Sequence, residues 1–182
     1  DQLEQAGIRL VRVPDNPSIE GLTEKITRIA AALDRSAAGA ALAGTLRAQI
    51  TAIDARPPAK ANLKLMFLLS AGPQGLMAAG RETAAAALID LLRAHNVFAA
   101  HRGYAPASAE MLAGAGVDYV LVSARSLEAL GGVAPLLSLP GLAASGLTPE
   151  QVVPIDDLAA LSFGPRLPAS LQGLAERLAG PP

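Results

Sequence analysis

A glycine-rich segment over residues 70–83 is the first part of this 182-residue chain whose residue types could support chemistry. Gly75 and Gly80 have the spacing of the phosphate-binding loop of nucleotide hydrolases. They are followed by Arg81 and Glu82, where that loop needs a lysine and a metal-binding hydroxyl. Nucleotide hydrolysis is therefore rejected. Two interpretations remain: a plain connecting loop, or a loop that accepts an anionic group such as a carboxylate near a helix start.

The other polar residues form no known catalytic or metal-binding pattern. His95 and His101 have no third ligand at helical or hairpin spacing, which favours solvated loop histidines over a metal site. The absence of cysteine excludes disulfides, zinc–thiolate sites, iron–sulfur clusters and thiol nucleophiles. Asp156 and Asp157 precede a short helical turn, and capping is favoured over acid–base catalysis. An enzyme on an α/β sheet is therefore the less favoured function class.

Arg125 is the best-supported candidate for ligand binding, because of its position along the chain. It follows a predicted strand over residues 117–123, and ligands bind beyond the carboxyl ends of strands in open α/β sheets. Arg81 and Tyr104 fall in predicted loops that could open on the same edge. The alternative for Arg125 is a surface arginine that caps the next helix.

Composition excludes several kinds of partner. Fifteen basic and 16 acidic residues give a net charge of −1, without the positive charge expected for nucleic acid or an anionic membrane. Aromatic residues make up 3% of the chain, too few for a base-stacking platform. The longest uncharged stretch, 129–149, is broken by prolines and glycines, so no membrane-embedded segment is expected. No signal peptide is present and the chain starts at Asp, which indicates a mature or truncated product.

Hydrophobic periodicity predicts the elements that must position these residues. The amino-terminal segment has a helix end over residues 1–6 and an alternating strand over 8–13. Apolar residues at helical spacing then continue over 17–56, where a prolyl pair ends the pattern. A single helix of this length would extend roughly 60 Å at about 1.5 Å per residue, which indicates a bridge between two lobes. Two helices with a break near residues 36–39 are the alternative.

Residues 62–180 alternate strands and helices, which predicts a three-layer α/β sandwich around a mostly parallel sheet. The predicted strands are 63–69, 97–98, 117–122 and 151–155, and the predicted helices are 82–93, 108–113, short pieces within 127–137, and 167–178.

Several segments together resemble one known family. The segments 67–72, 77–89, 102–110, 120–132, 139–142 and 156–168 are similar to the C-terminal lobe of periplasmic haem-binding proteins. These are the substrate-binding components of bacterial haem-uptake ABC transporters. Leu-Glu-Ala-Leu-Gly-Gly at 127–132 and Phe-Gly-Pro-Arg at 163–166 are the most specific parts of the resemblance.

The resemblance implies a class III periplasmic binding protein fold, in which one long helix joins two α/β lobes and haem lies in the cleft between them. Residues 1–15 would be the tail of an otherwise missing N-terminal lobe, 16–58 the long connecting helix, and 59–182 the C-terminal α/β lobe. The implied function is periplasmic capture of haem and its delivery to ABC permease subunits. A ferric siderophore or a corrinoid is the alternative ligand.

The resemblance also implies roles for single residues. The family's usual axial haem ligand is a tyrosine of the N-terminal lobe, so no metal ligand is expected in this chain. Some members add a histidine where Ala71 stands here, so this chain resembles the branch without it. In that branch a C-lobe arginine reaches towards the tyrosinate, and Arg125 is expected to be that arginine. A cation beside a phenolate lowers its pKa and favours the iron-binding anion.

Tyr104 is expected to line the cleft without binding iron. Ser70, Gly72 and Arg81 complete, with Ala71, the expected ligand-binding set around the first loop of the lobe. Glu110 matches the glutamate by which each lobe of this family docks on arginines of the permease.

Overall fold

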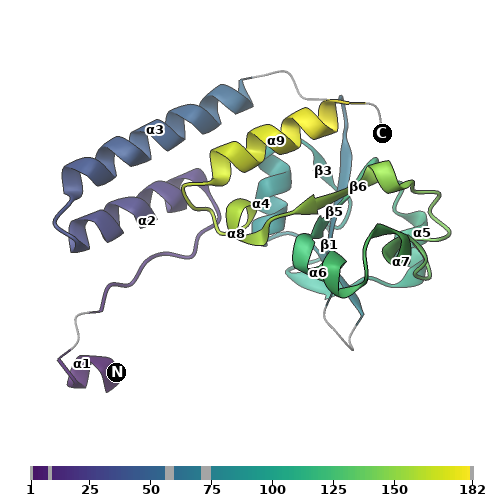
Figure 1. The fold of residues 1–182 in the computed structure, drawn as a ribbon, viewed down its shortest axis with the longest axis horizontal. Helices are drawn as coiled ribbons and strands as arrows, with labels where there is room; N and C mark the ends of the chain where they lie inside the picture. Colours follow the sequence, from purple (N-terminus) through teal and green to yellow (C-terminus); the bar gives the residue numbers. More distant parts are fainter. Residues whose placement is uncertain (1, 8–9, 56–59, 71–74, 181–182) are drawn as a thin grey trace.

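The chain forms a three-layer α/β sandwich, as its alternating strands and helices predict (Figure 1). The computed structural model describes residues 2–7, 10–55, 60–70 and 75–180. Its sheet has the strand order β4-β2-β1-β5-β6, with β3 also paired to β1. The strands are β1 (Lys64–Ser70), β2 (Leu76–Ala79), β3 (His95–Asn96), β4 (Tyr104–Pro106), β5 (Tyr119–Ser123) and β6 (Val152–Ile155).

The strands β1 and β5 form the centre of the sheet, because their apolar side chains pack into the hydrophobic cores on both of its faces. They pair in parallel, with Leu65 opposite Tyr119 and Leu68 opposite Val122. Side chains alternate across a strand, so Leu65 and Phe67 enter one core while Met66 and Leu68 enter the other. Burial on both faces explains the continuous apolar runs. The strand β6 adds in parallel to β5 and forms one edge of the sheet.

The other half of the sheet is antiparallel, which the sequence does not predict. The strand β2 pairs antiparallel to both β1 and β4. The second half of the glycine-rich segment is therefore a strand rather than a loop. Its apolar residues Ala78 and Ala79 are buried, and this burial stabilises a strand too short to show a clear period.

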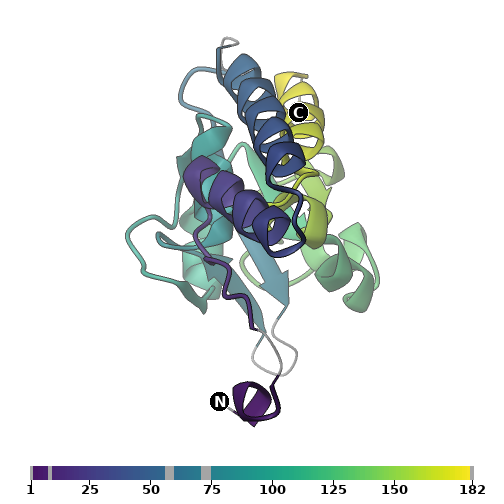
Figure 2. The ribbon, with the colours of Figure 1, turned by 90° about the vertical axis from the view of Figure 1, so that its left-hand side faces the viewer.

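Helices cover both faces. One face carries α2 (Ile19–Ala32), α3 (Ser36–Asp54), α4 (Ala84–Leu91), α8 (Asp157–Ala160) and α9 (Leu167–Ala179). The opposite face carries α5 (Ala109–Gly114), α6 (Ala124–Ala129) and α7 (Val133–Leu137). A 3₁₀ turn, η2 (Pro149–Gln151), leads into β6, and α1 (Gln2–Gln5) lies apart from the sandwich (Figures 1 and 2). None of the helices in the described ranges is long and apolar enough to cross a membrane.

The single helix expected over residues 16–58 is wrong, and the alternative of two helices is correct: the described part of this segment holds a helical hairpin. The helix α2 ends at Ala32, Asp34 adopts a φ of 55°, and α3 begins at Ser36. Figures 1 and 2 show α2 and α3 side by side, with α3 next to α9. A Cβ at Gly39 would clash with the Ala30 methyl group, so glycine permits this close approach. At 19 residues, α3 is about 28 Å long.

The strand predicted over residues 8–13 is also wrong in the part that the structure describes. Residues 10–17 adopt no regular secondary structure. Val11 and Val13, which alternate in the sequence as in a strand, are 44% and 42% exposed. A strand needs a partner for its backbone N–H and C=O groups, and none of the described strands pairs with this segment.

Three smaller corrections concern element boundaries. The helix predicted from residue 82 begins at Ala84, because the Thr83 side chain accepts a hydrogen bond from Ala86 N and caps it. The short strand predicted at 97–98 lies at His95–Asn96, where it pairs with β1. The strand β4 was not predicted, since three residues are too few for a periodic pattern.

Candidate functional site

The parallel strands β1, β5 and β6 bring their carboxyl ends to one edge of the sheet. Ser70 ends β1, Ser123 ends β5, and Asp156 follows β6 directly. The register sets Ser123 opposite Ile155, so the ends of β5 and β6 lie at the same level. Ligands of open α/β sheets bind beyond this edge, which makes it the first place to look for a site.

A hydrogen bond between Ser123 and Asp157 joins two of these strand ends. The Ser123 hydroxyl donates to Asp157 Oδ2 at 2.7 Å, and Ser123 Oγ accepts a hydrogen bond from Ser126 N at 3.3 Å. The second carboxylate oxygen, Asp157 Oδ1, is buried and has no hydrogen-bond partner among the described residues. The edge therefore holds a fixed carboxylate with unused capacity to accept a hydrogen bond.

Arg125 is exposed in the first turn of α6, beside this carboxylate-bearing edge. No described residue forms a hydrogen bond or an ion pair with its guanidinium group, and the Ser123 side chain already caps α6. A cation in the first turn of a helix gains nothing from the helix dipole. The helix-capping alternative for Arg125 thus has no contact to support it, and its donors are available to a ligand.

Tyr104, the first residue of β4, is 40% exposed and its hydroxyl has no hydrogen-bond partner in the described ranges. Partial burial, and then the negative charge of Asp157, raise the pKa of Tyr104 above its ordinary value of 10.0. The hydroxyl is thus a neutral phenol at neutral pH and can donate one hydrogen bond. The pairing of β4 with β2 sets Tyr104 opposite Ala79.

Three predicted site residues lie at the end of β1 or directly after it. The backbone of Ser70 ends β1 opposite Leu76 of β2, so it lies at the same edge. Ala71 and Gly72 lie outside the described residues, and their part in ligand binding stays a prediction.

Arg81 is not brought to this edge. Because β2 runs antiparallel to β1, the chain after Ala79 lies towards the amino end of β1. There Arg81 N donates to His101 O at 2.8 Å. The Arg81 guanidinium group donates to the carbonyl groups of Ala99 and Ala100. These contacts give Arg81 a structural role in holding the loop that precedes β4.

Glu110 is exposed in the first turn of α5, which is capped by the Ser108 side chain. Hydrogen bonds from its own backbone N–H and from the Ser108 hydroxyl lower the pKa of Glu110. The side chain is therefore ionised and open to a partner from solvent.

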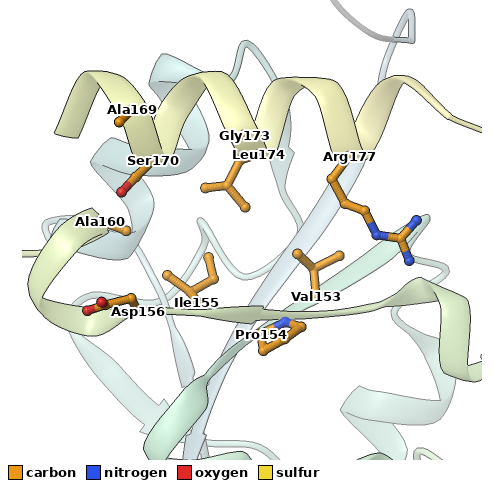
Figure 3. A pocket seen from close by; sticks show the side chains of 10 residues that line it. All are labelled: Val153, Pro154, Ile155, Asp156, Ala160, Ala169, Ser170, Gly173, Leu174 and Arg177. Atoms are coloured by element: carbon orange, nitrogen blue, oxygen red, sulfur yellow. The ribbon is translucent and has the colours of Figure 1, made fainter. Parts of the chain in front are cut away.

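A second hollow, between β6 and α9, differs from the carboxyl edge in its polar groups. This open groove of about 410 Å³ has Asp156 near one end and Arg177 near the other (Figure 3). Asp156 accepts a hydrogen bond from Ala159 N at 3.0 Å, and Arg177 donates to Glu150 O at 2.7 Å. Both charged groups are already engaged within the chain, so the carboxyl edge is the better candidate site.

No metal centre is formed by the described residues. Within the described ranges, no three or more histidine, cysteine, aspartate or glutamate side chains gather in a group that could hold a metal ion. The ring of His101 lies 6.0 Å from that of Phe98, as expected for a loop histidine packed beside an aromatic residue.

The sandwich and its polar carboxyl edge define a ligand-binding α/β lobe. The sequence profile of the periplasmic binding protein family matches residues 1–145, and the chain belongs to this family. A search of curated proteins found no match.

Three solved structures are similar over nearly the whole chain. Periplasmic heme-binding protein BhuT in complex with two hemes is 37% identical with a TM-score of 0.86, and the match covers 98% of this chain and 69% of BhuT. Periplasmic heme-binding protein RhuT from Roseiflexus sp. RS-1 is 31% identical with a TM-score of 0.88, at 98% and 69% coverage. Periplasmic heme-binding protein HutB of Vibrio cholerae is 30% identical with a TM-score of 0.85, at 97% and 70% coverage.

Proposed function

We propose that this chain is part of a periplasmic substrate-binding protein that captures haem and delivers it to an ABC transporter permease. The observation that carries the proposal is the similarity to BhuT, a haem-binding protein, at 37% identity over 98% of this chain. RhuT and HutB, also haem-binding proteins, support the same ligand. Haem is the cargo here, and the chain acts by binding and release rather than by catalysis.

The guanidinium group of Arg125, which has no partner among the described residues, supports the choice of haem as the ligand. Haem presents anionic groups: two propionates, and a phenolate oxygen when a tyrosine binds its iron. A guanidinium group without an internal partner forms charge-assisted hydrogen bonds to such oxygens. Tyr104 adds a partly exposed neutral donor, and its place in the haem site is part of the proposal. We assign both residues to the haem site, with Arg125 directed towards the iron-bound tyrosinate.

The division of the longer protein is part of the proposal. The match covers 69% of BhuT, so we assign residues 59–182 to a C-terminal lobe and 1–15 to the tail of an N-terminal lobe. The axial tyrosine would come from that N-terminal lobe. The α2–α3 hairpin and the chain that follows it would lie between the two lobes.

A ligand-retention assay tests the choice of haem. The protein would be this chain preceded by the amino-terminal part of BhuT, which supplies the other side of a cleft. It would be mixed in turn with haem, ferrichrome as a ferric siderophore and cyanocobalamin as a corrinoid, then separated from free ligand by gel filtration. We expect retained absorbance with haem alone. Retention of ferrichrome or cyanocobalamin in place of haem would overturn the assignment.

A further inference from the structure

A hydrogen bond joins the first turns of two helices at the carboxyl edge of the sheet. Ser123 is both the last residue of β5 and the N-cap of α6. Asp157 is the first residue of α8, which follows β6 after the capping residue Asp156. The Ser123 hydroxyl donates to Asp157 Oδ2 at 2.7 Å, although the two residues are 34 positions apart in the chain. This bond therefore ties the start of α6 to the start of α8.

The hydroxyl group of Ser123 serves two partners at once. A hydroxyl group has one proton to donate and lone pairs that accept. Its proton goes to the Asp157 carboxylate, and Ser123 Oγ accepts a hydrogen bond from Ser126 N at 3.3 Å, which caps α6. The bond to the charged acceptor is the shorter and the stronger of the two. Asp157 thus holds the Ser123 side chain in the rotamer that leaves a lone pair for Ser126 N.

The helix α6 depends on this cap more than a longer helix would. It spans six residues, and a helix this short is not stable through its own backbone hydrogen bonds. Its first turn buries Ser126 and Leu127 and leaves Arg125 exposed. A change in the orientation of this turn would therefore move the Arg125 backbone, and with it the reach of the guanidinium group.

Asp157 has a feature that helix capping does not explain. Its neighbour Asp156 caps α8 by accepting a hydrogen bond from Ala159 N at 3.0 Å. Asp157 instead leaves Oδ1 buried without a partner among the described residues, which costs stability. An unsatisfied buried oxygen in a native fold calls for an explanation other than stability, and the link to the turn that carries Arg125 offers one.

We propose that the Ser123–Asp157 hydrogen bond positions Arg125 for the haem site, so that Asp157 is a positioning residue acting through Ser123 and the first turn of α6. The inference rests on the proposed haem function, in which Arg125 meets an anionic oxygen of that site. A guanidinium group whose helix turn is already fixed loses less freedom on binding, so it binds the same oxygen more tightly. Because Asp157 acts only through Arg125, its effect on haem should vanish when Arg125 is absent.

A hydrogen-exchange measurement tests the positioning step on this chain and needs no haem. NMR follows the exchange rate of the Ser126 backbone N–H in wild type, D157A and S123A. S123A removes the acceptor and D157A releases the hydroxyl group that carries it, so exchange at Ser126 should be about threefold faster or more in both. S108A removes the corresponding cap of α5, another six-residue helix, and should leave exchange at Ser126 unchanged. Equal rates in wild type and D157A, or a similar increase in S108A, would overturn the proposal.

A double-mutant cycle on haem release tests the link to Arg125. The protein is this chain preceded by the amino-terminal part of BhuT and loaded with haem, and transfer to excess apomyoglobin gives the release rate. D157A should speed release about three- to tenfold, less than R125A, because the guanidinium group remains but is held less firmly. In the R125A background D157A should add nothing, since residues that act as one unit are not additive. An equal factor in both backgrounds would give Asp157 a merely structural role and overturn the inference.

Two further variants keep the cycle decisive. Where D157A does not fold, S123A breaks the same hydrogen bond from the other side and takes its place. S108A loses a comparable helix cap and should release haem at the wild-type rate. Release by S108A as fast as by S123A would indicate a general loss of stability and contradict the proposal.

The inference and the proposed function fail in different ways. Absence of haem binding by the parent protein would overturn the proposed function, and with it the role of Asp157 towards haem. Haem binding by the parent protein, together with additive effects of D157A and R125A on release, would overturn the inference alone.

Discussion

Asp118 and Lys64 exchange hydrogen bonds at the amino edge of the sheet. Lys64 N donates to Asp118 Oδ2 at 2.7 Å, and Asp118 N donates to Lys64 O at 2.8 Å. Lys60 Nζ contacts Asp118 Oδ1 at 2.6 Å, and Gln151 Nε2 donates to Asp118 O at 2.9 Å. One residue thus joins the starts of β1, β5 and β6, at the edge opposite the candidate site.

Replacing Asp118 by Ala should destabilise the chain in a pH-dependent way. The loss leaves Lys64 N without its acceptor and should cost about 1–3 kcal/mol, or a melting temperature lower by roughly 2–4 °C per kcal/mol. Burial raises the pKa of Asp118, but hydrogen bonds from Lys60 and Lys64 outweigh it, and the net pKa lies below its ordinary 3.8. The stabilisation is therefore complete above about pH 5 and is lost as the pH falls through the folded-state pKa.

Thermal melting of wild type and D118A at pH 7 and at pH 2.5 measures this effect. The difference between the two proteins should shrink at the lower pH. D90A, which removes an exposed carboxylate on α4, serves as the control. A difference of equal size at both pH values would contradict the hydrogen-bonded role of the Asp118 carboxylate.

Arg125 and Arg81 should respond differently to replacement by Ala. In the haem-loaded protein with a restored amino-terminal lobe, R125A should raise the haem dissociation rate by about 10- to 100-fold, the effect of losing a hydrogen bond to a charged group. Its charge-transfer bands should shift as well. R81A should lower the melting temperature, because it loses its contacts to the carbonyl groups of Ala99 and Ala100, and should leave the dissociation rate unchanged.

Transfer of haem to excess apomyoglobin, followed by absorbance, measures both rates. If R81A released haem as fast as R125A, the placement of Arg81 away from the ligand would be wrong. An unaltered rate and spectrum in R125A would remove Arg125 from the site.

Glu110 should matter for transport and not for haem affinity. E110Q should reduce haem uptake into proteoliposomes that carry the permease, because it removes an exposed, ionised side chain that can pair with permease arginines. Haem affinity should be unchanged. The lowered pKa of Glu110 also predicts that docking persists into mildly acidic solution.

Glu150 offers a matched control for Glu110. It is also an exposed glutamate early in a short helical segment, and its pKa is also lowered by its own backbone N–H and by a capping hydroxyl, that of Thr148. Transport by E150Q should equal that of wild type. An equal loss in both variants would indicate a general charge effect rather than docking through Glu110.

The central strands were predictable because their signal is local. The apolar runs of β1 and β5 follow from burial on both faces of the sheet. The Phe-Gly-Pro-Arg segment is likewise recognised from consecutive residues alone. The break between α2 and α3 was predicted only as the alternative, because helical periodicity continues through it. It depends on the conformation of Asp34 and on the close contact between Gly39 and Ala30. The strand predicted at residues 8–13 was wrong for a related reason. Strand formation requires a pairing partner, and the alternating pattern of one segment does not show whether a partner is present.

The residues of the candidate site also fall into two groups, those that the sequence selects and those whose placement depends on the tertiary fold. Arg125 was selected by its position after a strand and Glu110 by a segment match, and both assignments stay predictions. Asp157 was assigned to helix capping, because the sequence around it does not reveal its hydrogen bond with Ser123, which is distant along the chain. Its contact depends on the register that sets Ser123 of β5 opposite Ile155 of β6. Arg81 was misplaced because the antiparallel direction of β2 carries it to the other edge.

A haem titration followed by absorbance tests the central claim most directly. It compares this chain with the same chain preceded by the amino-terminal part of BhuT. Only the longer protein should develop a high-spin, tyrosinate-type spectrum at a one-to-one or two-to-one haem ratio, because the axial oxygen is expected on the other lobe. This chain alone should bind haem weakly or not at all. Stoichiometric, submicromolar binding by this chain alone would contradict the divided cleft, and no binding by either protein would contradict haem as the ligand.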